Sequence, residues 1–481
     1  MKKNLSIVIL LISLAISQSV FSQTYSFAKG KVPEGWKIDK GVLHISSEKY
    51  KSGSRSLQIK WKQNAVLTIP SPTGISEACR NRNGGMNAWI YNESPTKENL
   101  LFSFRDETGK EVCQLPFLLD FKGWRCIWAK FQGDMNMSSK SNIQSVEIQF
   151  PQHTKKGVTY IDLLEFTSKV SWQNMSDAQY KVNRTDYSLI PDFIGYRNAT
   201  PKVEKVITAE DNQITTITDR LTTWYLGSGQ HSSERWIKMR TENEKTFIRN
   251  GVKAAQKIKI QYTEDHTPQG EPLFPMGAPT IIDGQEAKKF RSINENILLP
   301  LALDYRKNQN DQSLKKALYI YDWFNDQGWA DGSSTGTLCF EKLRSSGYFH
   351  SFFLLKEQLS PEQLKRELQT MNWFTMFGAC YQLPSHAGEV ADNLRALAIP
   401  KLIYALSQND KQEREVALTA FKHYMDNALG IAPGFFGTFK ADFSGYHHRG
   451  PYHSAYYPHA LYAGALIAYL LHDTPYALSE T

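Results

Sequence analysis

The densest cluster of side chains that could do chemistry lies near the C-terminus, between residues 446 and 457. This segment holds three histidines and four tyrosines: His447, His448, His453, Tyr446, Tyr452, Tyr456 and Tyr457. An imidazole near its ordinary pKa and a phenol can serve as a base and an acid in proton transfer. Gly445, Gly450 and Pro451 predict a loop, and loops on rigid scaffolds often carry functional residues.

Two other interpretations of this cluster stay open. His447, His448 and His453 could bind a metal, although their spacing is not a known zinc pattern and no carboxylate or cysteine lies beside them. The cluster could also be hydrogen-bonded loop packing. We favour proton transfer and expect no metal site here and no organic cofactor; a requirement for a divalent cation such as calcium or magnesium stays open.

The first part of the chain predicts the scaffold of one domain. Residues 23–168 contain short alternating runs separated by turn signals, which are typical of a jelly-roll-like β-sandwich of the carbohydrate-binding type. The runs lie at 56–61, 87–91, 102–104, 124–131, 146–150 and 159–166. Residues 169–200 are polar and irregular, and we expect them to form a linker.

Helical periodicity dominates residues 201–481, and successive helix pairs predict an α/α toroid, incomplete at its C-terminal end by the resemblance described below, or a solenoid-like array. Ser360-Pro361 followed by Gln363 is a strong helix start. Other apolar helical runs lie at 311–324, 390–400, 416–424 and 458–472. We expect Pro400 to kink or end its helix. The last run is apolar nearly all round, so we expect it to be buried.

Residues 1–22 resemble a cleaved secretory signal. Lys2 and Lys3 precede the apolar stretch 7–16, which is too short to span a bilayer, and Val20-Phe21-Ser22 is a plausible cleavage site. A retained N-terminal anchor is the alternative. Since no later segment has the length of a membrane span, we expect a secreted or periplasmic protein without a membrane partner.

Composition narrows the class of partner. The 481 residues are 41% hydrophobic and 22% charged, which excludes a disordered, collagenous or coiled-coil chain. Loss of the two leader lysines lowers the net charge from +8 to +6. This charge suits an anionic partner such as an acidic polysaccharide or a nucleic acid, and equally a basic protein without such a partner. The sequence contains no run of five or more basic residues, which argues against a nucleic-acid-binding tail. We also expect the protein to be a monomer. The five cysteines form no CxxC pair, and pairing of Cys113 with Cys126 stays open.

Several motifs together resemble polysaccharide lyase family 8, and the chondroitin sulfate ABC lyases most closely. They are Asp326-Gln327-Gly328-Trp329 with Gly332-Ser333, Asp392-Asn393-Leu394, Asp442 through His448-Arg449-Gly450, Tyr457-Pro458 and Leu470 through Pro475. The order of signal, β-sandwich, linker and helical toroid also fits. The resemblance implies β-elimination in a glycosaminoglycan: the C5 proton of a uronic acid is removed, its carboxylate is neutralised, and the 4-linked sugar is expelled.

The resemblance also implies roles for single residues. His448 matches the catalytic histidine and Asn393 the carboxylate-neutralising asparagine. Tyr457 best matches the catalytic tyrosine. ABC-type members space the catalytic histidine and tyrosine more closely, but that spacing falls on Ala455, which cannot transfer a proton. Tyr456 is therefore the alternative. The expected substrate-binding residues are Trp329, Tyr348, His350 and Arg449. Cys339-Phe340-Glu341 stands where some ABC-type members carry paired histidines, a difference that bears on substrate range.

The family's catalytic group includes an arginine and a glutamate beyond the tyrosine. This chain stops at Thr481, 24 residues after Tyr457, so the resemblance predicts a C-terminally truncated lyase with weak or absent activity. Two other functions stay open: a polysaccharide-binding protein that no longer turns over, and an α/α-toroid glycoside hydrolase. A hydrolase would need two facing carboxylates, for which Glu389, Asp392 and Asp442 are available.

Overall fold

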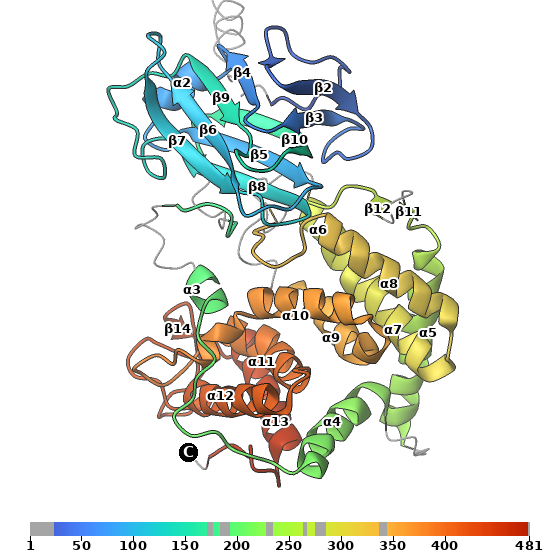
Figure 1. Cartoon of the computed structure of the whole chain (residues 1–481). Helices are drawn as coiled ribbons and strands as arrows, with labels where there is room; N and C mark the ends of the chain where they lie inside the picture. Colours follow the sequence, from blue (N-terminus) through green and yellow to red (C-terminus); the bar gives the residue numbers. More distant parts are fainter. Residues whose placement is uncertain are drawn as a thin grey trace, which may run out of the picture. The chain divides into compact units, whose positions relative to one another are not determined.

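A computed structural model describes residues 24–170, 177–182, 193–227, 234–262, 267–274, 285–335 and 344–479 (Figure 1). The predicted signal at 1–22 lies outside these residues, as do half of the predicted linker and Cys339-Phe340-Glu341. The chain divides into two compact units. One comprises residues 1–172 and 179–187, and the other comprises 173–178 and 188–481.

The N-terminal unit is a β-sandwich of two antiparallel five-stranded sheets, as predicted. The first sheet has the order β1 (Lys37–Ile38), β4 (Val66–Pro70), β9 (Ser145–Gln149), β6 (Asn99–Arg105) and β7 (Glu111–Leu118). The second has the order β2 (Gly41–Ser46), β3 (Ser56–Lys62), β10 (Lys156–Thr167), β5 (Gly85–Asn92) and β8 (Gly123–Lys130). Helix α2 (Ile75–Arg80) joins β4 to β5.

The core of the sandwich lies between the two sheets. On β5, Met86, Ala88 and Ile90 alternate along the strand and enter this core, as the two-residue period of a strand requires. Cys113 on β7 and Cys126 on β8 belong to different sheets and are not joined to each other. Burial raises the pKa of the Cys113 thiol to about 12, so this thiol is unreactive near neutral pH.

The C-terminal unit is helical, as predicted. Its helices in chain order are α3 (Phe193–Arg197), α4 (Asp211–Leu226), α5 (Arg235–Ala255), α6 (Gln285–Ile293), α7 (Leu299–Asn308), α8 (Asp311–Asp326), α9 (Ser346–Leu355), α10 (Pro361–Thr375), α11 (Ala391–Leu406), α12 (Lys411–Leu429) and α13 (Tyr456–Leu471). A π-helical turn (Asn294–Leu298) leads from α6 into α7, and β11 (Ile260–Tyr262) pairs with β12 (Pro268–Gly270).

Neighbours in sequence are mostly neighbours in space, which is the packing expected of a toroid. Helix α7 packs on α5 and α8, α11 packs on α10 and α12, and α13 lies against α11. Helix α13 also contacts α4, so early and late helices of the unit meet. Figure 1 shows α13 beside α4 near the C-terminus.

Two helix predictions can be compared directly with the structure. Ser360 accepts a hydrogen bond from the backbone N–H of Gln363, whose side chain accepts one from the N–H of Ser360, so α10 starts with the predicted capping box. Pro400 lies inside α11, and the helix continues to Leu406. The proline therefore does not end this helix.

The prediction of a fully buried last helix is wrong. Ala463, Ile467 and Leu470 of α13 are buried, but Leu461, Tyr462 and Tyr469 remain 48–60% exposed. An all-apolar sequence predicts burial on every face, whereas here only one face of α13 is covered. Among the described helices, none is both long enough and apolar enough to cross a bilayer.

Candidate active site

The predicted cluster folds into a tight hairpin that leads into α13. Strand β13 (Tyr446–His447) pairs with β14 (Gly450–Pro451), and His448 and Arg449 form the turn. Both turn residues have positive φ, 52° and 64°. Two positive φ angles suit a two-residue hairpin, but this conformation is costly for residues other than glycine. Strain of this kind persists at functional sites, so the turn is a candidate for one.

Histidine and tyrosine rings stack at the base of this hairpin. The ring of His447 lies 3.9 Å from that of Tyr456, nearly parallel, and 3.8 Å from that of His448. The ring of His448 meets Tyr456 edge-on at 5.9 Å, and Tyr452 contacts Tyr456 at 4.9 Å. His448 is exposed and Tyr456 partly exposed. The structure therefore brings one accessible imidazole and one accessible phenol together.

An ion pair at the start of α11 lies behind this stack. Asp392 pairs with Arg395 at 2.6 Å, and the other oxygen of Asp392 faces Nε2 of His447 at 3.6 Å. The guanidinium of Arg395 also lies over the ring of Tyr456, at 5.5 Å. Burial lowers the pKa of His447, and His448 and Arg395 lower it further, although Asp392 opposes this. His447 is therefore neutral near pH 7.

Asn393 follows Asp392 and is held by its own contacts. Its amide nitrogen donates to Glu389 at 3.2 Å, and Glu389 also accepts from the hydroxyl of Tyr424 at 2.9 Å. Burial, and then the charge of Glu389, raises the pKa of Tyr424, so that hydroxyl remains a donor. Glu389 thus fixes the side chain of Asn393, which follows the residue that faces His447.

Tyr457 packs against the preceding loop. Its hydroxyl donates to the backbone oxygen of Phe443, at 3.4 Å, and its ring packs on Phe439. Among the described contacts, none joins Tyr457 to a histidine ring. A Cβ atom at Gly445 would lie 1.9 Å from the ring of Tyr457, so this glycine allows the ring to close over the loop. In the structure Tyr456, rather than Tyr457, accompanies His448.

Trp329 and Tyr348 lie in the interior. Both are fully buried, and Trp329 stacks face to face on Phe374 at 3.6 Å. Their rings are already covered by protein and offer no face to a sugar, so the expected substrate contacts of these two residues are not available in this structure. A buried aromatic packs the core of the unit here rather than lining a cleft.

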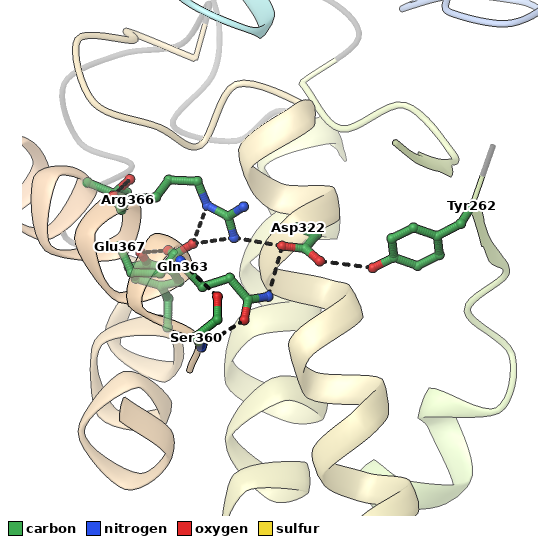
Figure 2. A network of polar contacts seen from close by, with 8 residues as sticks. Tyr262, Asp322, Ser360, Gln363, Arg366 and Glu367 are labelled. Atoms are coloured by element: carbon green, nitrogen blue, oxygen red, sulfur yellow. Dashed lines mark hydrogen bonds and ion pairs between the residues drawn. The ribbon is translucent and has the colours of Figure 1, made fainter. Parts of the chain in front are cut away.

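The hydroxyl of Tyr348 donates to Glu367 in a network that joins three helices and β11 (Figure 2). Arg366 contacts both Glu367, at 2.9 Å, and Asp322 of α8, at 2.7 Å. Asp322 in turn accepts from the hydroxyl of Tyr262, at 3.0 Å. Burial raises the pKa of Glu367 although Arg366 opposes the shift. The arginine is therefore the group that allows two carboxylates to sit so close.

Replacing Arg366 with methionine should destabilise the protein by about 2–4 kcal/mol, because Glu367 and Asp322 would be left without their shared cation. The midpoint of urea unfolding measures this loss. Arg291→Met is the matched control, since Arg291 pairs with Glu295 while its side chain is 53% exposed, and such surface pairs contribute little. Equal effects of the two substitutions would contradict the role given to Arg366.

His350 belongs to a separate histidine–tyrosine contact. Its Nδ1 is hydrogen-bonded to the hydroxyl of Tyr225 on α4, and Trp224 and Phe353 pack around the pair. Burial lowers the pKa of His350 to about 4. The imidazole is neutral near pH 7 and accepts a hydrogen bond from the phenol, so it can join α9 to α4.

Acidification should therefore weaken the fold through His350. Between pH 6.5 and pH 4 the unfolded chain binds a proton at this imidazole and the folded chain does not, so the free energy of unfolding should fall by about 2 kcal/mol over this range. Urea unfolding across the range measures the fall. His350→Phe should lack this component, whereas an unchanged pH dependence in the variant would contradict the assignment.

The sequence analysis named His447 and Asp392 for other roles and did not name Arg395. In the structure Asp392 and Arg395 pair behind the stack that contains His447. Only the spacing of Asp392 and Arg395 on one helix face could have indicated their pairing. Arg449, predicted to bind substrate, is exposed in the turn next to His448. His453 is exposed outside the stack. In the described part of the chain, no group of three metal-ligating side chains is placed to hold an ion.

Comparison with known families gives this geometry a context. The family model described as "Lyase, N terminal" matches residues 21–182, and the one described as "Lyase, catalytic" matches residues 200–481, more than half of the chain. The chain belongs to polysaccharide lyase family 8. The family resemblance of the sequence motifs is thereby confirmed, and the hairpin, Asn393 and Tyr456 all lie within the catalytic match.

Two curated relatives are similar along nearly the whole chain. The chondroitin sulfate ABC exolyase of Bacteroides thetaiotaomicron is 25% identical over 95% of this chain and 46% of the relative, and that of Proteus vulgaris is 20% identical over 97% and 49%. The chain thus spans about half the length of these relatives. The CBM22-1 xylan-binding domain from Paenibacillus barcinonensis is similar to 31% of this chain and 95% of itself, at 13% identity and a TM-score of 0.22.

Proposed function

We propose that this chain is a glycosaminoglycan lyase that cleaves beside a uronic acid by β-elimination. The observation that carries the proposal is the meeting of His448, in the strained hairpin, with Tyr456 at the start of α13, within the catalytic match of a lyase family. Asn393 lies at the start of α11, next to Asp392, which faces the same stack. A base, an acid and a group that can neutralise a carboxylate are the parts that this reaction needs.

The proposed reaction uses no cofactor. The imidazole of His448 takes the C5 proton of the uronic acid, and the electron pair of the broken C5–H bond forms a double bond between C4 and C5. The bond from C4 to the linking oxygen breaks, and the phenol of Tyr456 protonates that oxygen as the preceding sugar leaves. Tyr456 then regains a proton and His448 loses one to solvent, so the cycle balances.

Masking the uronate carboxylate makes the C5 proton removable, because the charge that develops at C5 would otherwise add to the charge of the carboxylate. Asn393 supplies an amide donor held by Glu389, and Arg449 supplies a guanidinium in the turn itself. Preorganised donors aimed at developing charge are usually the largest contribution to catalysis. The amide of Asn393 and the guanidinium of Arg449 therefore serve both to bind the uronate and to stabilise the charge that develops at C5.

Chondroitin and dermatan sulfates are the proposed substrates, with hyaluronan as a further substrate. The support is the printed activity of the two relatives, chondroitin sulfate ABC exolyase, together with the basic net charge of the chain. We also propose that residues 1–22 direct export to the periplasm or the medium, and that the protein acts there as a monomer without a nucleic-acid or membrane partner. The composition of the leader supports the export proposal.

Product analysis tests the reaction class. The protein is incubated separately with chondroitin sulfate, dermatan sulfate and hyaluronan, and both ultraviolet absorbance and reducing ends are measured. A lyase generates a conjugated double bond with every cleavage, so the two signals should rise together. New reducing ends without new absorbance would indicate a hydrolase, and binding without either signal would indicate a binding protein; each result would overturn the proposal.

A further inference from the structure

We propose that a groove between α5 and the end of α7 is a second binding site for the acidic polysaccharide, separate from the hairpin that carries His448. This inference rests on the proposed function, because it names the same ligand class. The groove would hold the polymer chain, which repeats its carboxylates and sulfates, while another part of the chain reaches the reacting residues.

The groove is a hollow of about 550 Å³, a size typical of sites for small ligands or for part of a longer one. Its walls come from the C-terminal half of α5 and from the last turn of α7 with the residues that follow. Its polar lining includes Lys245, Arg249, Lys253, Asp304, Lys307 and Asn308. Four of these six side chains are basic.

Three of the basic residues recur every fourth position along α5. Lys245, Arg249 and Lys253 are all exposed and lie on one face, and the helical rise places the first and last about 12 Å apart. Like charges at this spacing destabilise a helix by a few tenths of a kcal/mol per pair. Such a row of cations is more readily explained by a repeating anionic ligand than by the stability of the helix.

The row lacks strong internal counterions. Lys245 pairs with Glu242 at 2.8 Å, but both side chains are about two-thirds or more exposed, and pairs of this kind are weak. Among the described residues, no ion pair involves Arg249 or Lys253. These two cations are therefore available to an anion that enters the groove.

The acidic side chains of the groove already have partners. Glu244 forms an ion pair with Lys307. Asp304 accepts hydrogen bonds from Asn308 and Asn310, both at 2.7 Å, and from Ser313 at 2.5 Å. Lys307 offsets Glu244, whereas Asp304 keeps its charge because its donors are neutral. The charged lining residues are four cations and two carboxylates, so the groove carries a net charge of 4 − 2 = +2.

The two walls of the groove are also held firmly together. A Cβ atom at Gly251 would lie 2.2 Å from the side chain of Pro300 at the start of α7, so α5 approaches α7 as closely as a glycine allows. Figure 1 shows α5 and α7 side by side, on the far side of the helical unit from β14. The groove is thus a preformed site, well away from the hairpin.

Direct binding measurements test this inference. The fluorescence anisotropy of a labelled long chondroitin sulfate chain measures its affinity for three proteins: the unmodified protein, a groove variant and a control variant. The groove variant carries Lys245→Ala, Arg249→Ala and Lys253→Ala. The control variant carries Lys205→Ala, Lys315→Ala and Lys365→Ala. The control removes three exposed lysines of the same unit from other surfaces. The groove variant should bind roughly a hundredfold more weakly, since each cation near a polyanion contributes about a factor of five. The control should change by no more than about threefold, as three unrelated surface charges would.

The same proteins separate this inference from the proposed function. Turnover of a short chondroitin tetrasaccharide should be unchanged in the groove variant, because so short a chain engages the hairpin alone. If no protein forms unsaturated product, the proposed reaction fails while the binding comparison still decides about the groove. Equal affinities of the two triple variants would overturn the inference, and so would tighter binding of duplex DNA than of chondroitin sulfate through the groove residues.

Discussion

Replacing His448 with alanine should lower the rate at which unsaturated product forms by roughly 10²–10⁴-fold, the usual contribution of a positioned acid or base. The exposed imidazole in the strained turn is the group that we propose takes the C5 proton. His447 is buried and stacked between its neighbours, and its ring is not open to a substrate. Absorbance of the product under saturating substrate measures the loss.

His453→Ala is the matched control for this prediction. His453 lies five residues away in the same loop and is exposed, but its ring makes no described contact with the stack. The control should retain activity within a few-fold, and both variants should unfold at the same temperature as the parent. A His448→Ala protein that keeps full activity would remove this residue from the mechanism.

Tyr456→Phe should reduce product formation by roughly 10²–10³-fold, whereas Tyr457→Phe should change it by less than about threefold. Both substitutions remove only a hydroxyl. The ring of Tyr456 lies 5.9 Å from that of His448, while the hydroxyl of Tyr457 faces a backbone oxygen of the loop. The two variants are therefore controls for each other, and initial rates with one substrate compare them.

The opposite order of effects would contradict the site described above. It would support the motif-based choice of Tyr457. The start of α13 would then have to rotate before catalysis, so that the hydroxyl of Tyr457 leaves Phe443 and approaches His448. Equal and small effects of both substitutions would mean that neither Tyr456 nor Tyr457 protonates the leaving oxygen. In either case Tyr456 would not be the acid that acts with His448.

Local sequence patterns were sufficient for the architecture. The alternation of Met86, Ala88 and Ile90 fixes which face of β5 enters the core, and the cap at Ser360 fixes where α10 begins. Such signals act over a few residues and are visible without the fold. The last helix was less predictable, because the exposure of Leu461 and Tyr462 depends on which other helices cover α13.

The candidate site could be predicted only in part. The cluster of histidines and tyrosines indicated the loop in which the structure stacks these rings, and the motif around Asn393 indicated the helix start whose Asp392 faces His447. Which tyrosine turns toward His448 depends on where α13 starts and on the space above Gly445, and neither is visible in a spacing. Trp329 and Tyr348 had the composition of a sugar-binding surface, yet long-range packing placed both inside.

Isotopic labelling at C5 of the uronic acid is the most direct test of the proposed chemistry. The protein is given chondroitin whose uronic acids carry deuterium at C5, and the unsaturated product is analysed by mass spectrometry and nuclear magnetic resonance. Removal of the C5 hydrogen by His448 predicts a product without deuterium at that carbon and a slower reaction than with ordinary substrate. A cleaved product that retains deuterium at C5 would contradict the account.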